Sequence, residues 1–450
     1  MRTTDNNRGK LVSELGFKAE NENDILFISN KTLKELAEID NLLIFPHFLN
    51  AEYKDLEAKD YVFSLHPKTQ GEYELHTGNV MGFIGRNNTQ LTISSRFYPD
   101  NDDLFLHYML QKVFAINIFD LEHSKDHDPI LDFLLYLFPY YLKLALNQGL
   151  YKEYQGKQYN DANIKGPIDV ARHIQINNPF MGKIAYHTRE HSYDNYLTQL
   201  IRHTIEFIRM HKFGIGILSN NFDTQNAVNQ IVYATPTYEK NSRLKIINQN
   251  LRSVNHPYFT EYAQLQKICL QILRKEGLTY GDEKDKVYGL LFDGAWLWEE
   301  YLNVILQGKE FIHPQNKEKK NPQYLFKNNS GLIYPDFFKE TNPIVVADAK
   351  YKRIETTNFA NDNPEFGRSD LYQVMAYMYR FKANKGYLLF PKKMNEDYDT
   401  TALYEPYYFH ENSYGGEIIK LGLKIPLGKS NFGAFSDAIM IYEEKFLEKI

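Results

Sequence analysis

The composition of the 450-residue chain is that of a folded globular protein. Hydrophobic residues make up 43% and charged residues 24%, which excludes the disordered, collagen-like and coiled-coil classes. At about 150 residues per domain, the length predicts roughly two to three domains. The 52 basic and 57 acidic residues give a net charge of −5. The chain therefore carries no overall positive field, and any DNA contact must come from a local patch.

The cysteine content and the apolar runs indicate the compartment. One cysteine, Cys269, excludes an internal disulfide framework and any zinc site that needs two or more thiolates. The amino terminus is polar, and the most apolar run, Ile130 to Leu146, contains Asp132, Pro139 and Lys143. That run is shorter than the roughly 20 residues of a membrane span. We therefore expect a cytoplasmic protein that does not contact a membrane, with a buried helix at this run.

The fold class that we predict is α+β and multidomain. Residues 1–100 are predicted to form a mostly β amino-terminal domain, because strand-like apolar runs alternate there with polar turns. The expected strands include 24–30, 60–66 and 88–97, and a helix is expected at 31–39. Within Gly78–Phe97, two apolar stretches flank the turn residues 85–88. This pattern predicts a hairpin whose exposed end carries Arg86.

Residues 101–280 are predicted to form a mainly helical middle region, because the apolar period changes to that of a helix near residue 102. Gly149 is a suitable helix stop, and a loop with Lys165 and Asp169 follows it. The expected helices are 104–114, 129–149, about 194–211 and about 258–276, and a strand is expected at 183–192.

Residues 281–450 alternate helices and strands in the order typical of an α/β layer, and we predict a third domain there. The expected helices are 296–306 and 369–381, and the expected strands are 324–327, 332–338, 344–350 and 386–390.

An acidic and basic group lies in this third region, within YPDFFKETNPIVVADAKYK. The turn-forming ETNP places Asp336 on one strand of a hairpin and IVVADAK on the other. Side chains alternate along a strand, so Asp348 and Lys350 project to the same face. Two carboxylates and one ammonium are therefore expected in a small volume.

Cleavage of a phosphodiester needs this combination of groups. Carboxylates hold Mg²⁺ together with water and a phosphate oxygen. The metal acidifies the water and stabilises the transition state, and a lysine can orient the water or neutralise charge. In the alternative reading, Asp336 only caps a turn, and Asp348 with Lys350 forms a surface pair. The apolar run before Asp348 favours function, because a carboxylate at the end of a buried strand is costly unless a cation compensates it.

Two neighbouring helices supply further candidates. Glu299 and Glu300 lie in WLWEEYLNVIL, and one of them is expected to face the strand layer and complete a metal site. Gln373 and Tyr377 are four residues apart on a predicted helix and so share a face. Their alternative reading is an ordinary amphipathic helix.

These motifs together resemble the PD-(D/E)xK nuclease superfamily, and specifically the McrC family, the nuclease subunits of McrBC-type modification-dependent (5-methylcytosine) restriction systems. The matching segments are Gly78–Phe97, LWEEYL, YPDFF, VADAKYK and DLYQVMAYM. The resemblance implies a carboxy-terminal restriction-endonuclease-like α/β domain that depends on Mg²⁺, as one or two ions, or on Mn²⁺. It implies metal ligation by Asp336, Asp348 and Glu299, catalysis by Asp336, Asp348 and Lys350, and supporting roles for Gln373 and Tyr377.

The resemblance also implies partners. McrC proteins act with McrB, an AAA+ ring that hydrolyses GTP, and cleave double-stranded, modified DNA in defence against phage and other foreign DNA. The amino-terminal region of the family inserts into the motor ring and stimulates that hydrolysis. The resemblance therefore implies that the hairpin within Gly78–Phe97 contacts the motor partner, and it makes Arg86 and Arg96 candidates for partner contacts. The present chain contains no GxxxxGK[ST] phosphate loop, so a nucleotide would be bound by the partner.

Two departures from the family pattern leave questions open. The second acid of the motif is Asp348 rather than the commoner glutamate, and Lys165-Gly166 stands where the family tends to have glycine followed by arginine. The roles of Lys165 and Asp169 therefore stay open. Two other functions fit parts of the pattern: a stand-alone RecB-like repair nuclease, and a non-catalytic activator of an AAA+ NTPase.

Overall fold

The structure of the protein is a computed structural model, and it divides into two units that are described separately. The first unit contains residues 1–123 and 283–450, and the second contains residues 124–282. The described residues are 1–16, 21–29, 31–37, 42–45, 61–68, 72–87, 89–98, 103–114, 129–211, 214–219, 222–275, 287–314, 322–352, 368–393, 404–410 and 415–450.

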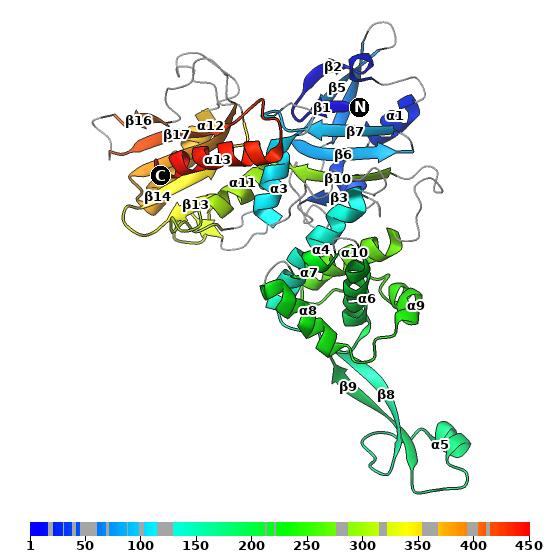
Figure 1. The fold of residues 1–450 in the computed structure, drawn as a ribbon. Helices are drawn as coiled ribbons and strands as arrows, with labels where there is room; N and C mark the ends of the chain where they lie inside the picture. Colours follow the sequence, from blue (N-terminus) through cyan, green and yellow to red (C-terminus); the bar gives the residue numbers. More distant parts are fainter. Residues whose placement is uncertain are drawn as a thin grey trace. The chain divides into compact units, whose positions relative to one another are not determined.

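The amino-terminal part of the first unit is built on a five-stranded sheet (Figure 1). Its apolar side chains pack with those of a three-stranded sheet and two helices into one buried cluster. The five strands, in spatial order, are β1 (Arg2–Thr4), β7 (Thr89–Ser94), β6 (Val80–Arg86), β10 (Val287–Asp293) and β3 (Leu42–Phe45). The three-stranded sheet has the order β2 (Arg8–Leu11), β5 (Tyr73–Thr77) and β4 (Phe63–Pro67).

The predicted hairpin is confirmed as β6–β7, with Asn87 in the left-handed conformation at its turn. Asn88 of the predicted turn lies outside the described residues. The hairpin does not project from the molecule, because β1 and β10 pair with its two outer sides. β10 comes from the third predicted range and pairs with β6 and β3 of the first range. The first and third predicted ranges therefore share one sheet.

The strand that we predicted at 24–30 is wrong, because Glu22–Ser29 forms helix α1. Its apolar run is continuous, so it has no period that distinguishes a helix from a strand. The buried residues Ile25 and Ile28 are three apart, which is helical spacing. The helix predicted at 31–39 is confirmed for Leu33–Ala37, which is α2.

The carboxy-terminal part of the first unit contains a second five-stranded sheet. β14, β15 and β17 are parallel, and β13 and β16 are antiparallel at the two edges. In spatial order the strands are β13 (Phe337–Lys339), β14 (Val345–Ala349), β15 (Lys385–Lys393), β17 (Glu417–Ile425) and β16 (Tyr404–Tyr408). The other elements of this part are α3 (Leu104–Phe114), α11 (Gly294–Ile305), α12 (Arg368–Phe381), α13 (Phe432–Leu447), β11 (Gln323–Tyr324) and β12 (Leu332–Ile333).

Helix α12 covers one face of this sheet. Val374, Tyr377 and Met378 of α12 share a buried cluster with Val346 of β14 and Leu388 of β15. On the other face, the hydroxyl of Tyr387 donates to the carbonyl of Lys449, just beyond α13. The two-residue period of β14 therefore places Asp348 and Lys350 on the α12 face, where Val346 lies.

The second unit is a helical bundle with one two-stranded arm (Figure 1). The predicted helical character is thus confirmed for this region, and Gly149 follows the end of α4 with a positive φ of 91°. The helices are α4 (Pro129–Asn147), α6 (Tyr196–Met210), α7 (Gly214–Ser219), α8 (Phe222–Ala234), α9 (Arg243–Gln249) and α10 (Glu261–Lys275). Short 3₁₀ turns occur at Lys240–Ser242 here and at Ser13–Leu15 in the first unit.

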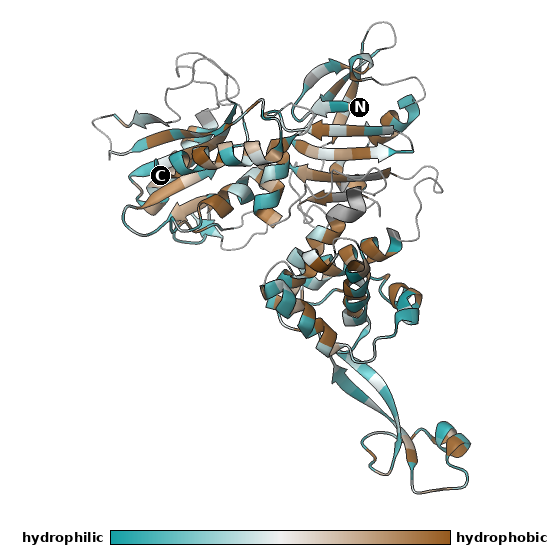
Figure 2. Ribbon diagram, viewed as in Figure 1, coloured by the Kyte–Doolittle hydropathy of each residue, from teal (hydrophilic) through white to brown (hydrophobic). Residues whose placement is uncertain are grey.

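The arm consists of β8 (Glu153–Asp161), β9 (Ile184–Ser192) and α5 (Val170–Ile176) between them. The sequence predicted β9 alone, because β8 is polar along its whole length and has no apolar alternation. Figure 2 shows β8 and β9 as mainly hydrophilic, in contrast to the apolar β6, β7 and β10. The arm is held by its backbone ladder of nine residue pairs, and within it Ala185 and Tyr186 of β9 are buried.

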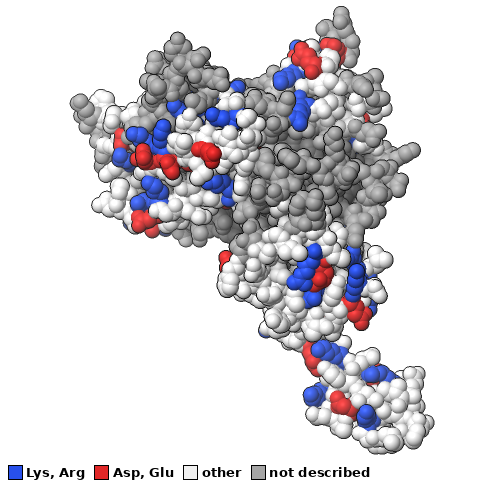
Figure 3. All heavy atoms as spheres, in the orientation of Figure 1, with Lys and Arg blue, Asp and Glu red and all other residues white. Residues whose placement is uncertain are grey.

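Two global expectations can be compared with the structure. On the face drawn in Figure 3, basic and acidic side chains are interspersed, and neither sign gathers into one broad field. None of the helices in the described part of the chain has the length and apolarity that crossing a bilayer requires.

Candidate active site

The candidate site lies where β14 ends. Val345–Asp348 are buried, and Asp348 is 1% exposed. The Nζ atom of Lys350 lies 2.5 Å from Oδ2 of Asp348. A buried carboxylate is costly unless a cation compensates its charge, and Lys350 supplies that charge. The predicted pairing of these two side chains on one face is confirmed.

The hairpin β13–β14 brings Asp336 to the same place. Asp336 directly precedes β13, which pairs antiparallel with β14. Its Oδ2 atom accepts a hydrogen bond of 2.7 Å from the backbone N–H of Ala349. Asp336 is thereby fixed beside the residue that separates Asp348 from Lys350.

The pKa values of the two aspartates are both raised. Burial, followed by the charge of Asp336, raises the pKa of Asp348 to about 8. Burial and the charge of Glu299 raise the pKa of Asp336 to about 7. Burial would lower the pKa of Lys350, but Asp348 and Asp336 outweigh this effect and raise it. The acids repel one another, so a further cation between them would be stabilised.

Helix α11 supplies the third acid, and the structure distinguishes between the two glutamates. Glu299 is 8% exposed, and its charge acts on Asp336. Glu300 faces His313 instead, with its Oε1 atom 3.5 Å from Nε2 of the imidazole. Of the two glutamates, Glu299 is therefore the one whose charge acts on an aspartate of the site, and its role as a metal ligand stays a prediction.

His313 was missed by the sequence reading. Its Nδ1 atom lies 2.9 Å from the carbonyl oxygen of Asp336 and 3.8 Å from Oε1 of Glu299. A carbonyl oxygen only accepts, so Nδ1 is the donor. Burial would lower its pKa, but Glu300, the Asp336 carbonyl and Glu299 outweigh this and raise it to about 9. No spacing signal links this lone histidine to the acids, because they meet only in the tertiary structure.

Helix α12, which covers the sheet face that carries Lys350, also holds the Lys350 side chain. Oε1 of Gln373 accepts a hydrogen bond of 3.1 Å from Nζ of Lys350, and Nε2 of Gln373 donates to the hydroxyl of Tyr377 at 2.6 Å. The Tyr377 hydroxyl in turn donates to the carbonyl of Tyr334 at 2.8 Å. The expected shared face of Gln373 and Tyr377 is confirmed, and it contacts the site.

Asp370 in the first turn of α12 is a further acid near the site. It is 4% exposed, and its Oδ1 atom lies 3.7 Å from Nζ of Lys350. Lys352 donates to both of its oxygens, at 3.1 and 3.2 Å. The motifs of the sequence do not place this residue in the site. Its acidic character at a helix start beside the motif was the one signal of its location.

The donor set is suited to a hard divalent cation. Neither oxygen of Asp348 has a well-aligned hydrogen-bond donor among the described residues, and the ammonium of Lys350 lies beside its carboxylate. Carboxylate oxygens are the ligands that Mg²⁺ prefers. Within the described ranges, however, no three His, Cys, Asp or Glu side chains already form a group arranged to hold a metal. Asp336 and Asp348 fit as ligands, with Glu299 beside them.

Comparison with known proteins was made for families, curated proteins and solved structures. A family model described as "McrBC 5-methylcytosine restriction system component" matches residues 75–391, which is more than two thirds of the chain. The chain belongs to this McrBC family. No curated protein matches it.

Two solved structures of McrBC complexes contain similar chains. One is the refined half-complex from a tetradecameric assembly of Thermococcus gammatolerans McrB AAA+ hexamers with bound McrC; the match covers 100% of both chains, at 14% identity and a TM-score of 0.51. This supports a similar fold alone. The second is the cryo-EM structure of the Thermococcus gammatolerans McrBC complex, at 13% identity and a TM-score of 0.32, covering 68% of this chain and 86% of the other. The second likeness is too low to carry an argument.

The two arginines that the McrBC resemblance assigned to partner contacts are both held internally. Arg86 forms an ion pair of 3.4 Å with Asp24 and stacks over the ring of Phe27. Arg96 is 5% exposed and pairs with Asp5 at 2.9 Å. The contact of Arg96 with a partner stays a prediction, and the burial of its side chain disfavours it.

The loop that departs from the McrBC family pattern lies at the end of the arm. Asp169 caps α5, since its side chain accepts from the backbone N–H of Arg172 at 3.1 Å. A Cβ on Gly166 would lie 2.1 Å from the carbonyl of His187 on β9, so glycine is needed at this close approach. Lys165 is exposed. Asp169 and Gly166 therefore have structural roles that account for their presence.

Proposed function

We propose that this McrBC-family chain is a Mg²⁺-dependent DNA endonuclease subunit with a site of the PD-(D/E)xK type. The observation that carries the proposal is the meeting of Asp336, Asp348 and Lys350 at the end of a buried strand. Family membership supports a restriction role against foreign DNA. The McrB AAA+ hexamers in the similar complex support a GTP-hydrolysing ring as the partner.

Each residue of the site then has a distinct part in the reaction. Bound Mg²⁺ would supply Lewis acidity and an activated water, with Asp336, Asp348 and Glu299 as its holders. Lys350 places its ammonium next to the acids, where it can neutralise charge that develops on the phosphoryl group. Gln373 holds Lys350, and Tyr377 holds Gln373, so the ammonium is oriented before DNA arrives.

The arm β8–β9 is the segment that we propose to contact the AAA+ partner. The hairpin β6–β7, which the sequence had favoured for this role, is enclosed by β1 and β10. The arm instead carries exposed apolar side chains near α5, in particular Val170, Ile174, Phe180 and Met181. Solvated apolar groups of this kind are typical of protein contact surfaces.

The test uses the full chain with a cognate AAA+ partner, GTP and Mg²⁺, on plasmid DNA with and without 5-methylcytosine. We expect cutting of modified DNA in the complete mixture. Lys350→Ala should lower the cutting rate by about 100-fold or more, because it removes a preorganised transition-state charge. Lys339→Ala is the matched control, since Lys339 lies on neighbouring β13 but pairs with Glu310 instead.

Three other outcomes would contradict the proposed function or the assigned site. Cutting by the chain without partner and GTP would favour a repair-type nuclease. Stimulated GTP hydrolysis without cutting of either DNA would favour a non-catalytic activator. Equal cutting by wild type and Lys350→Ala would show that the site is not the one assigned.

A further inference from the structure

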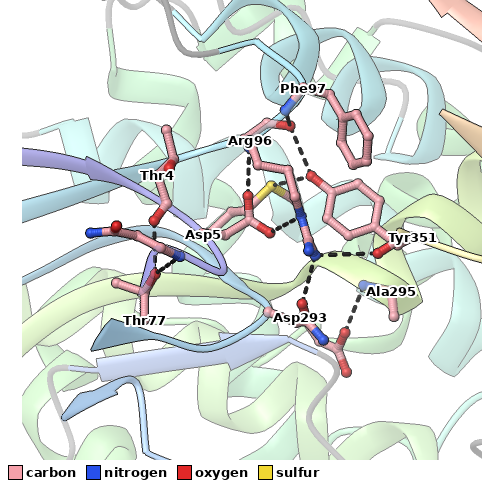
Figure 4. A network of polar contacts seen from close by, with 12 residues as sticks. Thr4, Asp5, Thr77, Arg96, Phe97, Asp293, Ala295 and Tyr351 are labelled. Carbon is pink, nitrogen blue, oxygen red and sulfur yellow. Dashed lines mark hydrogen bonds and ion pairs between the residues drawn. The ribbon is translucent and has the colours of Figure 1, made fainter. Parts of the chain in front are cut away.

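The buried arginine Arg96 belongs to a polar network inside the first unit (Figure 4). Its backbone N–H donates to Oδ1 of Asp5 at 2.5 Å, and its Nε atom lies 2.9 Å from Oδ2 of the same carboxylate. Asp5 itself is fully buried. Two buried charges of this kind are costly to desolvate, so stability alone is a weak reason for placing them there.

The free end of the guanidinium reaches the strand that carries the candidate active site. Nη2 of Arg96 donates to the carbonyl of Tyr351 at 3.2 Å, and Tyr351 directly follows Lys350. The Tyr351 hydroxyl lies 2.8 Å from Oγ of Ser95, and its ring packs edge-on against Phe97 at 5.0 Å. The residue after Lys350 is therefore held at its carbonyl, its hydroxyl and its ring by three consecutive residues.

The same guanidinium is connected to the start of α11. Nη2 of Arg96 also donates to Oδ1 of Asn79 at 2.6 Å. The carbonyl of Asn79 accepts from the N–H of Gly294, the first residue of α11, at 2.7 Å. Asp293 caps this helix through Ala295, as Figure 4 shows. Gly294 also packs so closely on Tyr351 that a Cβ would lie 2.8 Å from its ring.

One side chain thus connects two of the elements that supply the site. Lys350 directly follows β14, and α11 carries Glu299 less than two turns from its start. The contacts of Arg96 with Tyr351 and Asn79 act on the site through these neighbours, so Arg96 is a positioning residue and not a catalytic one.

We propose that Arg96 is a positioning residue of the nuclease site, which sets the relative placement of Lys350 and Glu299 through Tyr351 and Asn79. This inference rests on the proposed function. Its physical basis is that small displacements of reacting groups, of about 1 Å, can cost about 100-fold in rate. Lysine at this position could keep the ion pair with Asp5, but it lacks the planar fork that reaches Asp5, Asn79 and Tyr351 together.

The experiment compares Arg96→Lys with Asp24→Asn in the full chain. Asp24 is the matched control, because it is a buried carboxylate that holds Arg86 near the turn of the same hairpin, away from the site. The thermal unfolding temperature shows whether each variant is folded and how much stability it has lost. Hydrogen exchange of the peptide 345–352 reports the order of β14, including the Lys350 N–H that donates to Leu389 at 2.8 Å.

We expect Arg96→Lys to speed exchange in 345–352 by at least about 10-fold and to lower kcat for DNA cutting by about 10- to 100-fold, with KM for DNA unchanged. Asp24→Asn should lower the unfolding temperature without either change. Unchanged exchange and kcat in a folded Arg96→Lys protein would overturn the proposal, and so would equal effects in both variants. If the wild type does not cut DNA at all, the proposed function fails, while the exchange measurement still decides whether Arg96 orders β14.

Discussion

Hairpins β6–β7 and β8–β9 are both antiparallel strand pairs, but β6–β7 is buried between other strands whereas β8–β9 is largely exposed. In β6–β7 the side chains of Met81, Ile84 and Ile93 are fully buried, and neighbouring strands pair with both outer sides. β8 has no fully buried residue, and β8–β9 forms a sheet of two strands only. The apolar hairpin supports the candidate active site, whereas the polar hairpin is exposed or half-buried along most of its length and has exposed apolar side chains near α5. A hairpin pattern in the sequence thus predicts that two strands pair, but it does not predict whether the hairpin is exposed for contact with a partner.

The largest expected effect is a loss of stability when the packing of hairpin β6–β7 against β10 is disturbed. Gly82 on β6 has a positive φ of 124°, and an added Cβ would lie 2.1 Å from the carbonyl of Leu290 on β10. We expect Gly82→Ala to reduce the free energy of unfolding of the first unit by about 3 kcal/mol. Urea unfolding measures this change. An unchanged midpoint would show that β6 and β10 are not packed as described.

The next effect tests the arm as a contact surface. Ile174 on α5 is 62% exposed, so Ile174→Asp should leave the unfolding midpoint unchanged. We expect stimulation of the partner's GTP hydrolysis to fall by about 10-fold, because a charge would be buried at the contact. Tyr233→Asp is the control, since Tyr233 is 86% exposed on α8 of the same unit. Equal losses in both variants would move the contact away from the arm.

A smaller, pH-dependent effect concerns the bundle that carries the arm. His203 of α6 is fully buried beside Tyr238. Burial, then Arg243 and Arg202, lowers its pKa to about 4. The folded state resists protonation while the unfolded state, with a pKa near 6.5, accepts it, so stability is lost as the pH falls from about 6.5 to 4.

We expect the second unit to lose roughly 1 kcal/mol between pH 7 and 5.5 through this residue. Hydrogen exchange of the α6 amides at both pH values measures the loss. His203→Gln should flatten the pH dependence, and an equally steep dependence in that variant would assign the effect to another group.

The smallest expected change in stability concerns Gly156 on β8, which is the counterpart of Gly82 on β6. Gly156 on β8 has no atom within 4 Å of an added Cβ. Gly156→Ala should change the free energy of unfolding by less than about 0.5 kcal/mol, or raise it slightly by reducing the freedom of the unfolded chain. The same urea titration provides the value. A loss comparable to that of Gly82→Ala would mean that β8 is packed against another part of the chain.

The local parts of the candidate site could be predicted because they depend on short spacings. Asp348 and Lys350 share a face through the two-residue period of a strand, and Gln373 and Tyr377 share one through a helical turn. The turn at ETNP predicted that Asp336 would lie next to β14. The metal, the DNA substrate and the catalytic roles remain proposals.

Other parts of the site could not be predicted, because they join residues that are far apart in the chain. His313 and Asp370 come from two different elements and approach Glu299 and Lys350 through packing. Arg96 was named as a candidate for a partner contact, and in the structure it is paired with Asp5, 91 residues away. The periodicity of a single segment cannot predict such contacts between distant residues.

The sequence by itself determined the mainly helical character of the middle region, with helices α4, α6 and α10, together with the β6–β7 hairpin and the alignment of the acid and lysine motif, since these follow from local periodicity and turn chemistry. Only the tertiary structure decided that β10 joins the amino-terminal sheet, that the polar arm rather than the apolar hairpin is exposed, and that Arg96 connects Tyr351 with Asn79. The physical reason is that strand pairing and buried ion pairs depend on which distant surfaces meet, and that is set by the packing of the whole unit.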